Sequence, residues 1–200
     1  MHHLTIAITD LGDSAVTLPM AAVTIAILLV LRRIGMAAWW GGSIVVCAGV
    51  ITVLKLLLIA AAPHHHSLSG LTSPSGHAAM SAAVYGGFVL LIGPSLPRAW
   101  RIVVQLGALA LVLAIAMSRI VLHEHSIAET VVGLGVGFAV LAGLRAALSR
   151  GAAERVPVLV LCAAALAVIG VMHGTRLRTE PLIRALAHSG MVHELMPRHG

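Results

Sequence analysis

A histidine and a glutamate four positions apart, His125 and Glu129, are the pair in this sequence best suited to chemistry. On an α-helix, residues at this spacing share a face and their side chains can touch. A carboxylate that holds one imidazole nitrogen fixes the tautomer and makes the other nitrogen more nucleophilic. The competing interpretation is an exposed ion pair at a helix end. Glu129 lies within an apolar run, where an idle carboxylate is costly, and this favours a functional pair.

The segment Pro74-Ser75-Gly76-His77 is the second candidate. An apolar helix is expected to begin directly after it, which would put Ser75, Gly76 and His77 at a helix N-terminus. Free backbone N–H groups and the positive end of the helix dipole make such a place an anion site. The alternative is an ordinary helix cap with Ser75 as the capping residue, and this segment taken alone favours the cap.

Two cations, Lys55 and Arg119, accompany these segments. Lys55 lies inside an apolar run, eight residues before Pro63, which is about 12 Å of helix. That depth is large for a lysine that only snorkels to the interface, so we expect Lys55 to face the bundle interior. Arg119 ends another apolar run on the same side. Such cations and helix amides would hold an anion such as phosphate, while one histidine attacks phosphorus and another protonates the leaving oxygen.

The composition indicates that membrane helices must position these residues. The chain is 59% hydrophobic and 10% charged, with a mean hydropathy of +1.01, whereas soluble domains carry about 25% charge. The net charge is +6, but the basic residues form no stripe with interleaved aromatics. Nucleic acid is therefore not an expected partner.

We predict an all-α polytopic membrane protein, a six-transmembrane-helix bundle with the active site at the extracytoplasmic face. Each span needs about 20 helical residues, and the many small residues favour close helix packing. One domain is expected over residues 1–200, with a motif core at 55–129 and terminal segments at 1–13 and 174–200. The predicted spans are Ser14–Leu31, Gly42–Ala62, Ala78–Gly93, Ala99–Met117, Ile127–Leu148 and Pro157–Met172.

Arginines gather in the loops on one side of this bundle, which is therefore predicted to be cytoplasmic. The opposite side receives the loop Pro63–His77, which has no arginine or lysine, and both termini. We therefore expect a plasma (inner) membrane protein whose site faces the extracytoplasmic side, although the basic tail argues against this orientation. Two terminal segments, Leu4–Asp13 and Pro181–His188, are candidates for interfacial helices. The arginines on the predicted cytoplasmic side are Arg32, Arg33, Arg98, Arg101, Arg145, Arg150 and Arg155.

Three motifs in the chain resemble the signature of the type 2 phosphatidic acid phosphatase superfamily, which includes vanadium haloperoxidases and bacterial class A acid phosphatases. That signature reads KxxxxxxRP, PSGH and SRxxxxxHxxxD. It corresponds here to Lys55–Pro63, Pro74–His77 and Ser118–Glu129. Order and internal spacing match, and 40 residues separate the second motif from the third. The resemblance covers the motif core, and the surrounding apolar spans fit the six-helix membrane branch of the superfamily.

The resemblance implies a role for each matching residue. His125 would be the nucleophile that forms a phosphohistidine, and Glu129 would orient it. His77 would protonate the leaving group and later activate water. No metal or other cofactor is implied. The phosphate-binding residues implied are Lys55, Ser75, Gly76 and Arg119.

Two positions depart from the signature. Ala62 replaces the arginine before the proline, which removes a charged hydrogen bond typically worth about 1.5–3 kcal/mol. Glu129 replaces an aspartate and has a longer side chain. Either change predicts a shifted substrate, lower activity or a degenerate site. The accessory candidates near these positions are His64, His65, His66, Ser118 and His123.

Two functions remain open at this level. The first is a membrane phosphatase acting on a lipid or polyprenyl phosphate or pyrophosphate, with the bilayer and that lipid as its partners and no defined oligomeric state. The second is a catalytically degenerate phosphate- or lipid-binding protein, or a metal-handling protein built on the histidine-rich loop with Glu124. Three adjacent histidines do not readily aim at one ion, and their spacing resembles no established zinc site. The hydrophobicity excludes a soluble haloperoxidase-like enzyme.

Overall fold

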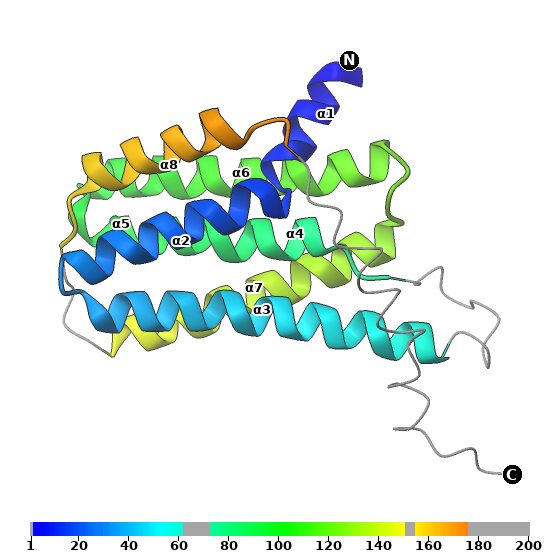
Figure 1. Cartoon of the computed structure of the whole chain (residues 1–200), viewed down its shortest axis with the longest axis horizontal. Helices are drawn as coiled ribbons and strands as arrows, with labels where there is room; N and C mark the ends of the chain where they lie inside the picture. Colours follow the sequence, from blue (N-terminus) through cyan, green and yellow to red (C-terminus); the bar gives the residue numbers. More distant parts are fainter. Residues whose placement is uncertain (1, 62–72, 151–154, 176–200) are drawn as a thin grey trace, which may run out of the picture.

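A computed structural model describes residues 2–61, 73–150 and 155–175 (Figure 1), and every regular element in these ranges is helical. The predicted all-α architecture is thereby confirmed. The helices are α1 (His2–Leu11), α2 (Ser14–Val30), α3 (Ile34–Ala61), α4 (Gly76–Ser81), the π-turn η2 (Ala82–Gly86), α5 (Gly87–Ile92), the 3-10 turn η3 (Gly93–Ser95), α6 (Arg98–Val121), α7 (Ile127–Ser149) and α8 (Val158–Met172).

Five helical segments in the described ranges are long and apolar enough to cross a membrane. The sixth predicted span corresponds to α8, whose 15 residues extend about 22 Å, less than a hydrocarbon core of roughly 30 Å. Two predicted boundaries were too narrow, because α3 begins at Ile34 and α6 continues to Val121. The five segments are His3–Val30, Ile34–Ala60, Gly76–Ser95, Arg98–Val121 and Ile127–Ser149.

The central helix of the bundle consists of α4, η2, α5 and η3 in succession, and the other helices surround it (Figure 1). Most side chains of α4 and η2 are small and buried. At the π-turn, Trp40 of α3 donates its indole N–H to the Ala83 carbonyl at 3.4 Å. The Tyr85 hydroxyl donates to the Leu11 carbonyl at 2.6 Å. These bonds fix the central helix to α3 and to the end of α1.

Two glycines allow α7 to lie directly against α4. A Cβ atom at Gly133 would overlap the carbonyl oxygen of Ser75, and one at Gly137 would lie 2.6 Å from the Ala79 carbonyl oxygen. This is the close backbone approach that a small-xxx-small pattern permits between membrane helices. The contact places the first turn of α7, with Glu129, beside the start of α4.

The two ends of the bundle differ in chemistry. The α2–α3, η3–α6 and α7–α8 connections lie at one end, while the start of α4 and the α6–α7 turn lie at the other (Figure 1). At the first end, Arg33 donates to the Arg155 carbonyl at 3.4 Å and Arg101 donates to the Gly93 carbonyl at 2.9 Å. The polar segments predicted to do chemistry lie at the second end. Between the ends, apolar side chains such as Leu166 (68% exposed) face outward, as a bilayer requires.

Candidate functional site

The buried carboxylate of Glu129 joins three segments at the site end of the bundle. One oxygen, Oε2, lies 3.0 Å from His125 Nδ1 and accepts from the Ser126 backbone N–H at 3.0 Å. The other, Oε1, accepts from the Ser73 backbone N–H at 2.7 Å. The backbone carbonyl of Glu129 accepts from the Ser75 N–H at 3.0 Å. Glu129 therefore connects the histidine of one motif to the PSGH segment of another.

The local sequence explains why Glu129 holds this position. Ser126 is the N-cap of α7, and its hydroxyl accepts from the Glu129 N–H at 3.2 Å. The Glu129 carboxylate bonds back to the N-cap N–H, which completes a capping box. The first turn of α7 thus orients the carboxylate before any contact with His125 is made.

A tight turn between α6 and α7 positions His125. The Arg119 carbonyl accepts from the backbone N–H groups of Glu124 and His125 at 3.0 and 3.3 Å. His123 adopts a left-handed backbone conformation, with φ of 56°, and is exposed. The His125 side chain is only 11% exposed. Because Nδ1 is held by Glu129, Nε2 is the nitrogen left to react.

Burial lowers the pKa of His125 below its ordinary value of 6.5. The hydrogen bond to Glu129 opposes this shift, whereas the positive charges of Arg119 and Lys55 reinforce it. The imidazole is therefore neutral at neutral pH, the protonation state a nucleophile needs.

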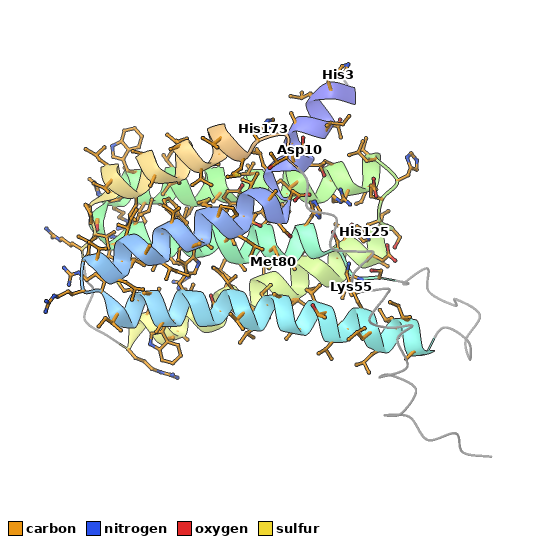
Figure 2. The ribbon with its side chains drawn as sticks, viewed as in Figure 1. His3, Asp10, Lys55, Met80, His125 and His173 are labelled. Carbon is orange, nitrogen blue, oxygen red and sulfur yellow. The ribbon has the colours of Figure 1, made fainter. Side chains whose placement is uncertain are left out.

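Lys55 and Arg119 approach the site from different helices. Lys55 lies in α3 with 5% exposure, as expected for a lysine that faces the bundle interior, at the same end as His125 (Figure 2). The Arg119 guanidinium, in the last turn of α6, donates from Nη1 to the Thr9 hydroxyl at 3.3 Å. Its Nη2 lies 3.7 Å from Glu124 Oε2. Two cations from different helices therefore lie near enough to His125 to act on its charge.

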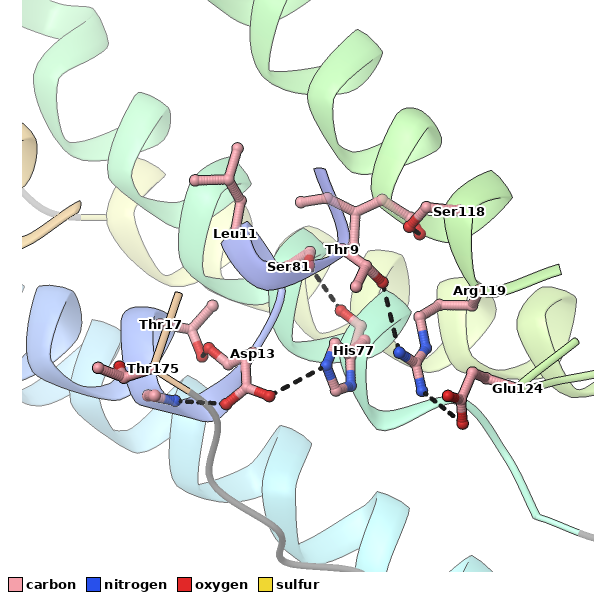
Figure 3. Close-up of polar contacts among 12 residues, drawn as sticks. Thr9, Leu11, Asp13, Thr17, His77, Ser81, Ser118, Arg119, Glu124 and Thr175 are labelled. Carbon is pink, nitrogen blue, oxygen red and sulfur yellow. Dashed lines mark hydrogen bonds and ion pairs between the residues drawn. The ribbon is translucent and has the colours of Figure 1, made fainter. Parts of the chain in front are cut away.

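The PSGH segment forms the start of α4. Ser75 is fully buried and caps the helix, accepting from the Ala78 N–H at 3.4 Å. Gly76 is the first helical residue and His77 the second. His77 Nε2 lies 3.5 Å from Asp13 Oδ2 (Figure 3), and the Ser81 hydroxyl donates to the His77 carbonyl at 2.6 Å. The structure therefore shows the helix cap expected of Ser75. The same segment also presents the N-terminus of α4, at which an anion site remains a prediction.

Several sequence candidates do not join this group. Ser118 is buried and donates its hydroxyl to the Ile115 carbonyl of its own helix at 2.7 Å. The positions of Ala62 and of His64, His65 and His66 lie outside the described residues, as does the predicted tail helix Pro181–His188. Within the described ranges, no three histidine, cysteine, aspartate or glutamate side chains are grouped so that they could hold a metal ion. Metal handling by the histidine-rich loop remains a hypothesis.

Two residues at the site were not predicted from the sequence, Thr9 and Asp13. Both belong to α1 and its junction with α2, a region considered only as an interfacial segment. Asp13 is the N-cap of α2 and is buried despite its charge. An aspartate directly before an apolar helix is a capping signal, but nothing in its local sequence indicates contact with His77.

A family comparison agrees with this arrangement of motifs. The model of the PAP2 superfamily matches residues 41–152, more than half of the chain. The match includes all three motifs, and the chain belongs to the PAP2 superfamily. Together with the apolar helices, this membership makes it a phosphatase-type membrane protein.

One relative is an uncharacterized 22.5 kDa protein in the cps region of Klebsiella pneumoniae. It is 27% identical over 132 residues, which cover 66% of this chain and 63% of that protein. The chain thus matches less than two thirds of that relative's length. No solved structure matches the chain.

Proposed function

We propose that this protein is an integral membrane phosphatase that hydrolyses a lipid or polyprenyl phosphate or pyrophosphate through a phosphohistidine intermediate. The observation that carries the proposal is the Glu129 carboxylate, which contacts His125 at Nδ1 and accepts from the N–H of Ser73, the residue directly before the PSGH segment. Buried Lys55 and partly buried Arg119 beside this pair supply positive charge for a phosphoryl group. No metal or other cofactor takes part in this scheme.

The first step forms the covalent intermediate. The His125 Nε2 lone pair attacks phosphorus, the bond from phosphorus to the ester oxygen breaks, and His77 transfers a proton to the departing oxygen. Lys55, Arg119 and the backbone N–H groups at the start of α4 would stabilise the charge on the remaining phosphoryl oxygens.

The second step releases phosphate. His77, now unprotonated, takes a proton from a water molecule as the water oxygen attacks phosphorus. The P–N bond breaks, its electron pair returns to His125, and inorganic phosphate leaves. The same residue serves as acid and then as base, so His77 ends the cycle protonated as it began.

The surroundings of the site favour a lipid substrate. The helices that carry it are flanked by outward-facing apolar side chains. A cavity of about 350 Å³ between the central helix, α6 and α7 is lined mainly by small and apolar residues such as Ala82, Leu109 and Phe138. It runs from beside α4 toward Arg145 and is separate from the described site residues. A groove of this kind suits a hydrocarbon chain. The arginine-rich opposite end favours an extracytoplasmic site in the plasma (inner) membrane.

The test is phosphate release from detergent-dispersed phosphatidic acid, phosphatidylglycerol phosphate and polyprenyl pyrophosphate. We expect His125→Ala to lose on the order of a thousandfold or more in kcat, since the nucleophile is gone. His173→Ala is the matched control, because His173 is an exposed histidine of the described residues whose Nε2 lies 3.2 Å from the Ala7 carbonyl oxygen. Undiminished release by His125→Ala would overturn the proposal. Phosphate binding by wild type without release from any substrate would favour the degenerate binding protein.

A further inference from the structure

The junction of α1 and α2 contacts the site at two points and is fixed to the central helix at a third. Asp13 Oδ2 lies 3.5 Å from His77 Nε2, and the Thr9 hydroxyl accepts from Arg119 at 3.3 Å (Figure 3). The Leu11 carbonyl accepts from Tyr85 at 2.6 Å. These junction residues precede the region that matches the superfamily, which begins at residue 41.

We propose that Asp13 is a positioning residue that holds the His77 imidazole for proton transfer. The inference rests on the proposed phosphatase function. Its basis is a carboxylate with only 8% side-chain exposure that faces a histidine of the PSGH motif from a different helix. Asp13 acts through His77 and does not itself touch the reacting atoms.

The backbone around Asp13 makes its carboxylate a fixed group. Oδ1 accepts from the Ala15 N–H at 2.8 Å, and the Asp13 carbonyl accepts from the Thr17 hydroxyl at 3.0 Å. The preceding Gly12 packs so closely that a Cβ atom there would lie 2.5 Å from an Ile115 methyl carbon of α6. Because one carboxylate oxygen is committed to the helix cap, the other is directed toward His77 with little rotational freedom.

This contact has a defined chemical consequence. An acceptor at Nε2 keeps the proton on that nitrogen, orients the ring, and leaves Nδ1 to exchange a proton with the ester oxygen or water. His125 is held in the complementary way, by Glu129 at Nδ1, with Nε2 left to attack phosphorus. Each histidine then has its own carboxylate, and the two carboxylates hold opposite ring nitrogens.

The choice of variant separates the proposed role of Asp13 at His77 from its structural role as the cap of α2. Asp13→Ser retains a good N-cap but has no oxygen that reaches His77, whereas Asp13→Ala loses both functions. Asp13→Asn keeps the cap with its single oxygen but turns an NH2 donor toward His77 Nε2, so it removes the acceptor with almost no change of shape. Thr17→Val removes a hydrogen bond from the same helix start and leaves the carboxylate in place.

The readout is the ratio of kcat/KM for an alkyl phosphate to that for p-nitrophenyl phosphate. An alkoxide needs a proton as it leaves, whereas nitrophenolate needs little assistance. We expect Asp13→Ser to lower the alkyl phosphate rate by about ten- to a hundredfold, a part of the roughly hundred- to ten-thousandfold that general acid catalysis contributes, and to change the nitrophenyl rate much less. Asp13→Asn, which presents a donor to Nε2, should also lower the ratio, and Thr17→Val should keep the wild-type ratio.

A double-mutant cycle with His77→Ala completes the test. If Asp13 acts through His77, Asp13→Ser should cost almost nothing further once the imidazole is absent. Equal losses on both substrates, or additive losses in the cycle, would overturn the assignment of Asp13. If Asp13→Ser does not fold, Asp13→Asn is used instead, and a wild-type ratio of the two kcat/KM values in that variant would overturn the assignment. Failure of the phosphatase function would be distinct, because wild type and His125→Ala would then release phosphate equally.

Discussion

At the scale of single residues, the glutamate at position 129 departs from the aspartate of the superfamily signature, and the extra methylene has an identifiable use. From the third position of α7, the Glu129 carboxylate reaches back to the N-cap N–H of Ser126 and across to the Ser73 N–H while contacting His125. An aspartate at the same backbone position is one methylene shorter, so its carboxylate would lie farther from these three partners. The departure is therefore consistent with an intact site.

The first prediction is that restoring the signature aspartate weakens this protein. Glu129→Asp should lower kcat/KM on a lipid phosphate by about tenfold or more, because even a small displacement of catalytic groups lowers the reaction rate strongly. It should also reduce the free energy of unfolding by about 0.5–1.5 kcal/mol, because the Ser126 N–H loses its carboxylate partner while the Ser126 hydroxyl cap remains. Phosphate release and thermal unfolding in detergent measure the two effects. Activity equal to or above wild type would contradict the geometry.

The second prediction concerns pH. The pKa of His125 lies below 6.5 because burial disfavours the charged ring, with Arg119 and Lys55 acting in the same direction. The neutral ring is the nucleophile, so kcat/KM should hold at neutral pH and fall as pH drops through this pKa, with a midpoint below 6.5. Glu129→Gln removes a negative charge that raises the pKa, and should move the midpoint to still lower pH. A shift to higher pH would disprove this account of the site.

At the scale of elements, hydropathy predicted the long helices well because lipid-facing spans must be continuous and apolar. The capping box also has a sequence signature, a serine followed three residues later by a glutamate, which Ser126 and Glu129 satisfy. The π-turn at Ala82–Gly86 could not, because it depends on packing against Trp40 and on the bond from Tyr85 to α1. The contact between Asp13 and His77 also escaped prediction, since it arises only when α1 folds against α6 and the central helix.

The third prediction follows from the contact between α4 and α7. Gly133→Ala would push a methyl group into the Ser75 carbonyl and separate the PSGH turn from Glu129. We expect a loss of about 1–3 kcal/mol in stability from overpacking and about ten- to a hundredfold in activity from misplacement. Purified variants compared by thermal unfolding and phosphate release provide the measurement.

Gly135→Ala is the matched control for this prediction, because it lies on the same helix two residues away. A Cβ atom there would meet nothing within 4 Å, so stability should stay the same or rise by up to about 1 kcal/mol, as for alanine in place of glycine within a helix. If both variants behave alike, the close approach of α7 to α4 does not position the site.

At the scale of the whole molecule, the division between the two ends follows from the sequence alone. Arginine-bearing loops and the exposed indoles of Trp39 and Trp100 come together at one end, as interfacial anchors do. The three motifs come together at the opposite end, because each motif lies where a predicted span reaches that side of the membrane. The sequence did not reveal which groups would touch within that end. Those contacts depend on helix rotation, which is set by small-residue packing such as that of Gly133.

The fourth prediction tests the orientation that this division implies. Ser149 and Thr175 are exposed hydroxyl residues that each donate to a carbonyl of the preceding helical turn, at 2.9 and 2.6 Å. Ser149 ends α7 at the arginine end, and Thr175 follows α8 at the site end.

In a background without Cys47 and Cys162, a membrane-impermeant thiol reagent applied to intact cells should label Thr175→Cys and not Ser149→Cys. Permeabilised cells should show both labelled. Labelling of Ser149→Cys alone in intact cells would place the site on the cytoplasmic side and reassign the leaflet from which a lipid phosphate enters.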